Sequence, residues 1–149
     1  MRLLTFIMFF LLGTISGAQE TRSNYARVRF LAVDIFVDSK GEPLAAYQLE
    51  FSATNGPVKI VGIEGGEHSA FREAPHYDPK AIQQDRGIIA AFSTEPHSKL
   101  PTGRTRVATI HIQVNAGMEP QFALNLQAAA DPSGHRLTVS TSATKRETQ

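Results

Sequence analysis

Short stretches of the chain alternate between apolar and polar residues, and this period of two is typical of half-buried β-strands. The clearest stretch is 105–114, where every second residue from Ala108 onward is apolar. Successive side chains of a strand point to opposite faces, so Ile110 and its apolar neighbours are predicted to face a core. The same pattern predicts further strands at 28–37, 44–54, 58–63, 87–92, 122–127 and 137–141.

Turn-forming residues separate the predicted strands. Gly, Pro, Asp and Asn gather at 38–43, 55–57, 115–120 and 131–134. The longest segment without a strand pattern is 67–85, where Asp78 and Pro79 predict one helical turn capped by Asp78. Because the strands are short and each has one apolar face, the sequence predicts an all-β fold with an antiparallel β-sandwich or barrel.

The N-terminus predicts export. Arg2 precedes an apolar run from Leu3 to Ile15, and small residues lead up to Ala18, as in a secretory signal peptide. A membrane anchor is the alternative, but a run of about 13 residues is shorter than the roughly 20 that span a bilayer. We therefore expect a periplasmic or extracellular protein with no membrane span after cleavage.

The predicted organisation has four parts. These are a signal peptide at 1–18, a flexible segment at 19–25, one domain at 26–142 and a polar C-terminal tail at 143–149. The chain contains no cysteine, so the domain must be stabilised by burial without disulfides. Lys and Arg number 15 against 14 Asp and Glu, and Arg2 is the one charged residue of the predicted signal peptide. The remaining charges balance, which does not favour a nucleic-acid partner.

Several strand motifs, taken in order, resemble a known family. They read LAAYQLEF at 44–51, VKIVGIEGG at 58–66, GIIAAF at 87–92 and VATIHIQV at 107–114. This order resembles bacterial cohesin domains and their relatives in the cellulose-binding-module superfamily, over residues 28–128. One departure is that Tyr77-Asp78-Pro79 lies later in the chain than the comparable step of the family. The resemblance implies a jelly-roll of about nine strands and a non-catalytic binding role, but not the identity of the ligand. We expect a binding or assembly module whose first-choice partner is another exported protein.

Two regions are the predicted binding surfaces. The loop that runs from Phe71 to Tyr77 offers aromatic side chains, and the outward row of the strand at 105–114 offers Thr109, His111 and Gln113. A polysaccharide is the alternative ligand, since exposed aromatic rings stack on sugars. The chain has no tryptophan, which favours a protein partner.

Other chemistry has weaker support in the sequence. His68, His76 and Asp78 flank one loop and would be candidate metal ligands if the loop brought them together. A periplasmic metal-binding protein is therefore the third functional hypothesis, after protein and polysaccharide binding. No Gly-x-Ser-x-Gly motif and no thiol is present, and no pair of carboxylates is singled out for general acid–base work. We therefore expect no catalytic residues and no cofactor.

The predicted facing of the strand at 105–114 can be tested by substitution. Ile110→Asp would bury an unpaired charge and is expected to unfold the domain, a loss of at least about 4 kcal/mol. His111→Ala, on the opposite face, is the matched control and should lower the free energy of unfolding by less than about 2 kcal/mol. Urea denaturation measures both, and an unchanged midpoint for Ile110→Asp would contradict the assigned facing.

Overall fold

A computed structural model describes residues 27–147 of the chain. The predicted signal peptide and the segment at 19–25 lie outside these residues. In the described part, eight strands and three short helical turns follow one another. The strands are β1 (Val28–Asp38), β2 (Ala46–Ala53), β3 (Lys59–Gly65), β4 (His76–Tyr77), β5 (Arg86–Phe92), β6 (Arg104–Asn115), β7 (Phe122–Ala130) and β8 (Ser140–Glu147). The helical turns are the 3-10 helices η1 (Ser69–Phe71) and η2 (His97–Lys99) and the α-helical turn α1 (Pro79–Ile82).

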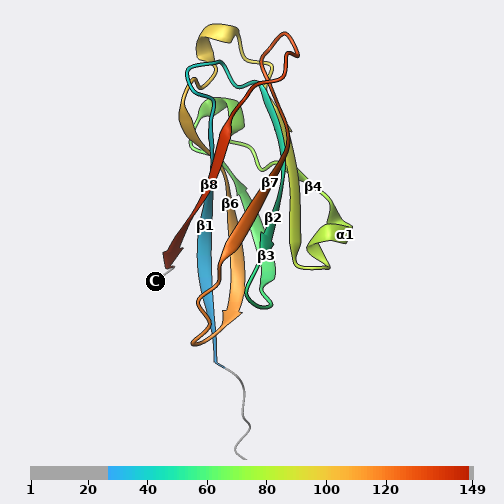
Figure 1. The fold of residues 1–149 in the computed structure, drawn as a ribbon, viewed down its shortest axis with the longest axis vertical. Helices are drawn as coiled ribbons and strands as arrows, with labels where there is room; N and C mark the ends of the chain where they lie inside the picture. Colours follow the sequence, from blue (N-terminus) through green and yellow to red (C-terminus); the bar gives the residue numbers. More distant parts are fainter. Residues whose placement is uncertain (1–26, 148–149) are drawn as a thin grey trace, which may run out of the picture.

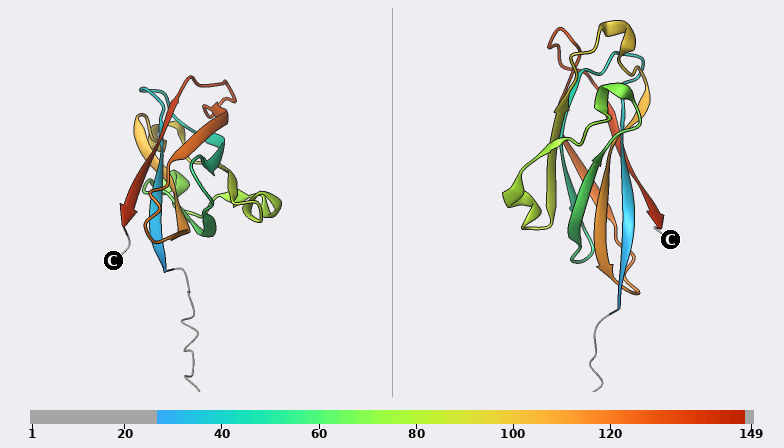
Figure 2. Two further views of the ribbon diagram at one scale, coloured as in Figure 1. Left: turned by 60° about the horizontal axis from the view of Figure 1, so that its bottom comes forward. Right: turned by 180° about the vertical axis from the view of Figure 1, so that it is seen from behind.

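The strands form two four-stranded antiparallel sheets (Figure 1). Sheet A has the order β3-β6-β1-β8, and sheet B has the order β4-β5-β2-β7. The chain passes from one sheet to the other at every connection except the one between β4 and β5. The two sheets lie face to face as layers along the long axis of the molecule (Figure 2). The predicted all-β, antiparallel class is confirmed; the described residues hold eight strands, where about nine had been expected.

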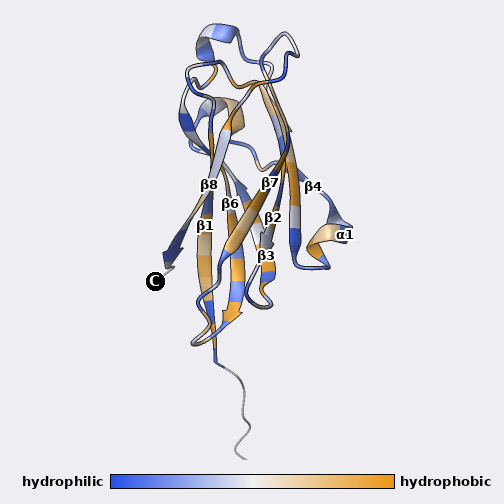
Figure 3. Ribbon diagram, viewed as in Figure 1, coloured by the Kyte–Doolittle hydropathy of each residue, from blue (hydrophilic) through white to orange (hydrophobic). Residues whose placement is uncertain are grey.

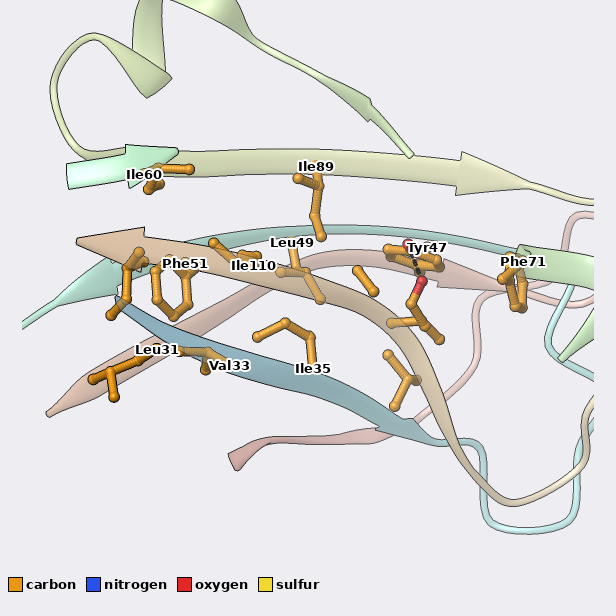
Figure 4. Close-up of a cluster of buried hydrophobic side chains, with 14 of the residues drawn as sticks. Leu31, Val33, Ile35, Tyr47, Leu49, Phe51, Ile60, Phe71, Ile89 and Ile110 are labelled. Atoms are coloured by element: carbon orange, nitrogen blue, oxygen red, sulfur yellow. Dashed lines mark hydrogen bonds between the residues drawn. The ribbon is translucent and has the colours of Figure 1, made fainter. Parts of the chain in front are cut away.

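One hydrophobic core lies between the two sheets (Figure 4). The alternation predicted from the sequence places its side chains, because each strand turns one face toward the other sheet. The buried members from sheet A include Leu31, Val33, Ile35, Ile110 and Ile112, and those from sheet B include Tyr47, Leu49, Phe51 and Ile89. Ile110 is completely buried, so the predicted facing of β6 is confirmed.

A hydrogen bond through this core joins the sheets. In the pairing of β1 with β6, Ile35 lies opposite Ala108 and Phe36 opposite Arg106, so Val107 is skipped as a β-bulge. The hydroxyl of Tyr47, from sheet B, donates to the carbonyl oxygen of Val107 at 3.1 Å (Figure 4). Burial raises the pKa of Tyr47, which keeps the phenol protonated as a donor.

A second bulge interrupts the period of two over 58–63, which predicts Ile63 on the face opposite Ile60. Ile60 pairs with Ile112 and Gly62 with His111, so Val61 is skipped. Ile63 then packs against the core instead of facing outward, and Val61 is left 48% exposed. A bulge adds one residue to one strand only, and a strict period of two cannot anticipate it.

The segment between β3 and β5 contains the predicted helical turn. Asp78 caps α1 by accepting a hydrogen bond from the backbone N–H of Lys80 at 2.8 Å, and Pro79 is its first residue, as expected. The two-residue strand β4 precedes it and pairs with β5, which the sequence pattern does not indicate. The turn α1 projects sideways from the two layers (Figures 1 and 2).

The C-terminal prediction is wrong. The strand expected at 137–141 begins later and runs on into the expected tail as β8, which pairs with β1 over its whole length. Residues 148 and 149 of the predicted tail lie outside the described residues. The sequence of β8 is polar and has no apolar alternation (Figure 3). Its place is fixed by partners from distant parts of the chain. Arg146 binds Asp34 of β1, and Lys145 forms an ion pair with Glu119 of the β6–β7 loop.

Membrane insertion has no support in the helices that the structure describes. In residues 27–147, none has the length and apolar character of a bilayer-spanning segment.

The bond between the sheets generates a stability prediction. Tyr47→Phe keeps the ring but leaves the buried carbonyl of Val107 without its donor, which should lower the free energy of unfolding by about 1–3 kcal/mol. Tyr77→Phe is the matched control, because Tyr77 is exposed and its loss of a hydroxyl should change little. Equal unfolding midpoints for the two variants would show that the Tyr47 bond does not stabilise the fold.

Candidate functional site

The outer face of sheet B carries a floor of small side chains. Because Tyr47 and Leu49 of β2 point into the core, Ala46 and Gln48 point outward. In the register of the sheet, Phe92 of β5, Ala46 of β2 and Ala130 of β7 form one row across the strands. The next outward row consists of Ala90, Gln48 and Ala128. Four of these six positions are alanine, whose short side chains leave a depression between the larger residues that border the face.

A hollow of about 250 Å³ lies over this floor. Its lining is predominantly apolar and contains no Lys, Arg, Asp or Glu; it consists of Ala46, Tyr47, Gln48, His76, Ala90, Ala91, Phe92, Ala128 and Ala130. Phe92 is 68% exposed, more than the other exposed large hydrophobic residues of the described chain. The ring of Phe92 is therefore an apolar group that faces solvent beside an apolar hollow.

The polar side chains near the hollow are fixed by hydrogen bonds and an ion pair to other residues of the same face. Gln127 is skipped in the pairing of β2 with β7, and its side-chain oxygen accepts a hydrogen bond from Gln48 Nε2 at 2.6 Å. Further along the same face, Arg86 and Glu50 form an ion pair at 2.6 Å. The hollow can thus offer apolar contact, an amide pair and the imidazole of His76.

The rim on the β4 side is positioned by the segment that follows β3. A Cβ on Gly65 would lie 1.9 Å from the carbonyl oxygen of Arg72, so only glycine allows this segment to approach so closely. Phe71 then enters the core and contacts the ring of Tyr47 edge-on, with ring centroids 5.3 Å apart. Pro75 is buried as well, and His76 follows it onto the edge of β5. A smaller hollow of about 140 Å³ lies between this segment and Phe92.

The aromatic residues predicted from the loop do not lie on this face. Phe71 is only 2% exposed, so its predicted role as a surface contact is wrong; its ring was needed to fill the core beside Tyr47. Tyr77 is exposed, but it lies opposite Ile89 on the core-facing side of β4. There it borders a groove with Val61 and Ile82 at the open side between β3 and β4.

The outward row predicted on β6 lies on the outer face of sheet A. Thr109, His111 and Gln113 do share this face, but Thr109 is fully buried and is not available as a contact. Its hydroxyl donates to Asp34 Oδ1 at 2.8 Å and accepts from Arg106 at 2.8 Å. His111 Nε2 lies 3.0 Å from Glu64 Oε1, and both His111 and Gln113 are half-buried.

Asp34 is the centre of this polar cluster on sheet A. It is 7% exposed, although it faces away from the core. Arg146 of β8 binds both carboxylate oxygens, at 2.7 and 2.8 Å. Burial acts to raise the pKa of Asp34, but the bonds from Arg146 and Thr109 and the charges of Arg146 and Arg106 outweigh it, so the pKa is lowered. The carboxylate on β1 thus bonds side chains from both neighbouring strands, Arg146 of β8 and Thr109 of β6.

The predicted metal ligands are not brought together. His68 Nδ1 accepts a hydrogen bond from the backbone N–H of Ala70 at 3.2 Å, and Asp78 caps α1. His76 lies at the rim of the hollow on sheet B. In residues 27–147, no group of three or more His, Cys, Asp or Glu side chains could hold a metal ion.

Phe92 and the alanine rows are the site residues that sequence reasoning missed. The stretch 87–92 reads as a continuous apolar run, which is typical of a strand buried on both faces. A strict period of two within it would have placed Ile88, Ala90 and Phe92 on one face, away from Ile89. The run alone does not say which of its faces is covered.

Comparison of the chain with protein-family models, with curated proteins and with solved structures gave no match. The resemblance to cohesin domains therefore remains an expectation from the strand motifs.

The Asp34 cluster generates a pH-dependent prediction. A carboxylate with a lowered pKa adds stability above its unfolded-state value of 3.8, and this contribution is lost as the pH falls through the lower folded-state pKa. Asp34→Asn should therefore lower the free energy of unfolding by about 1–3 kcal/mol at about pH 7. Near about pH 2 the difference from the parent should shrink.

Denaturation of both proteins across this pH range measures the effect. Asp38→Asn is the matched control on the same strand, since the Asp38 carboxylate accepts a hydrogen bond from the nearby backbone N–H of Lys40 and is not bonded to another strand in the described part of the chain. A difference between parent and Asp34→Asn that stays constant with pH would contradict the role of the ionised carboxylate.

Proposed function

We propose that this chain is an exported, non-catalytic binding or assembly module, with a cohesin-like jelly-roll sandwich, that binds another protein through the outer face of sheet B. The observation that carries the proposal is the exposed ring of Phe92 beside the alanine-floored hollow. An exposed apolar group next to an apolar depression is typical of an interaction surface.

The energetics of this face favour association. Burying an aromatic ring removes a large apolar area from water, and aromatic residues are enriched among the contacts that dominate binding energy. Alanine side chains lose no rotamer entropy when covered, so the floor is already ordered for a partner. Since the lining has no Lys, Arg, Asp or Glu, a partner would not have to desolvate an unpaired charge there.

The outer face of sheet A supports binding less well. The carboxylate of Asp34 is bonded by Arg146 and Thr109, and covering Arg146 with a partner would require desolvation of a charge that is already paired. His111 and Gln113 are the predicted contacts that stay accessible on this face. They are second candidates to the Phe92 surface.

Carbohydrate binding is the alternative function, and one observation favours it. The exposed ring of Phe92 lies close to the amide of Gln48 and the imidazole of His76, and a sugar ring needs both stacking and hydrogen bonds. A single phenylalanine, without tryptophan on the chain, is a small platform for a polysaccharide. A protein partner therefore remains the first choice.

The test compares Phe92→Ala with the parent in capture experiments against exported proteins of the same cells and against a panel of polysaccharides. Phe92→Ala should lower the affinity for a protein partner at least about tenfold, because the central aromatic contact is lost. Val61→Ala removes an exposed apolar side chain from sheet A and is the matched control, with no expected effect. Retention of the parent by a polysaccharide alone, with loss in Phe92→Ala, would replace protein binding by carbohydrate binding.

A further inference from the structure

We propose that the outer face of sheet B pairs with the same face of a second copy of this chain, in a dimer with twofold symmetry. This inference rests on the proposed function, because it names one protein that the face binds. The face carries both an apolar projection, Phe92, and an apolar hollow beside it. A surface with both features can be complementary to itself, as a twofold interface requires.

The strand order defines how two copies would fit. Strand β2 lies between β5 and β7, and Phe92, Ala46 and Ala130 occupy one row across these three strands. A twofold axis that runs along β2 in the plane of the interface places β5 of each copy over β7 of the other. Phe92 of each copy then faces Ala130 and the hollow of its partner at the same height along the strands.

The hollow is large enough for this contact. Its volume is about 250 Å³, and an apolar cavity of about 150 Å³ can already hold benzene. The β7 residues that line it are Ala128 and Ala130, so an incoming phenyl ring would meet methyl groups there. Two Phe92 rings, one from each copy, would form the centre of the interface, where dominant contacts are typically found.

Charges at the two ends of the row are complementary in the same arrangement. On the β7 side, the backbone of Arg136 forms an isolated antiparallel β-bridge with Ala130. The Arg136 guanidinium donates a hydrogen bond to the carbonyl oxygen of Gln127 at 2.8 Å. Glu73 borders the smaller hollow next to Phe92 at the β4 side. Both side chains are exposed. The axis along β2 brings Arg136 of one copy toward Glu73 of the other, twice per dimer. The hollow between these two pairs is lined by no charged side chain, so no like charges face each other there.

Sedimentation equilibrium of the protein as it is exported, at concentrations from about 1 to 100 µM, tests the dimer. We expect a dimer at the upper end of this range. Phe92→Ala should weaken dimerisation at least about tenfold, and Val61→Ala should leave it unchanged. Because Phe92 is largely exposed in the single chain, its substitution should not unfold the domain.

A charge exchange tests the symmetry. Glu73→Arg should weaken the dimer about threefold, and combining it with Arg136→Glu should restore the parent's affinity, since each new pair again has opposite charges. A protein that stays monomeric throughout, or a dimer that Phe92→Ala leaves intact, would overturn the inference. If the parent were monomeric but captured a different protein, and Phe92→Ala lost that capture, only the dimer would be overturned and the proposed function would stand. If Phe92→Ala changed neither dimerisation nor capture, the proposed function would fail with it.

Discussion

The hydroxyl of Tyr47 crosses the core to reach the carbonyl oxygen of Val107, and most other features of the molecule depend on the alignment that this bond fixes. The acceptor exists because β6 contains one residue more than β1 can pair with. The donor exists because β2 turns Tyr47 inward. Sheet A and sheet B are therefore held at one offset by a polar contact, within a core whose apolar packing alone is less directional.

The same alignment shapes the outer face of sheet B. A slip of one residue in β2 would turn Ala46 and Gln48 inward and expose Tyr47 and Leu49. Tyr47 also contacts Phe71, which anchors the segment that leads to Pro75 and His76. The rim of the hollow thus depends on a core contact, and the floor depends on the register of the strand that forms that core.

Local sequence signals predicted the parts of this structure that local physics decides. The facing of Ile110 follows from alternation within one strand, and the cap at Asp78 follows from a residue type at one helix end. The signals failed where a distant partner decides. The polar strand β8 is placed by Asp34 and Glu119, Phe71 is drawn into the core by Tyr47, and Thr109 is buried by its bond to Asp34. Phe92 could not be assigned to a surface until its neighbours across the sheet were known.

The design of the strand edges has a consequence for behaviour at high concentration. Open edges of β-sheets can recruit strands of other molecules and extend into fibrils. In the described chain, the edge strand β4 is only two residues long, and β8 carries Lys145 and Arg146. The other two edge strands, β3 and β7, are interrupted by the bulges at Val61 and Gln127. Each of these features makes continuous edge pairing unfavourable. Association through sheet faces can therefore stop at a defined number of molecules, whereas growth from the edges would have no end point.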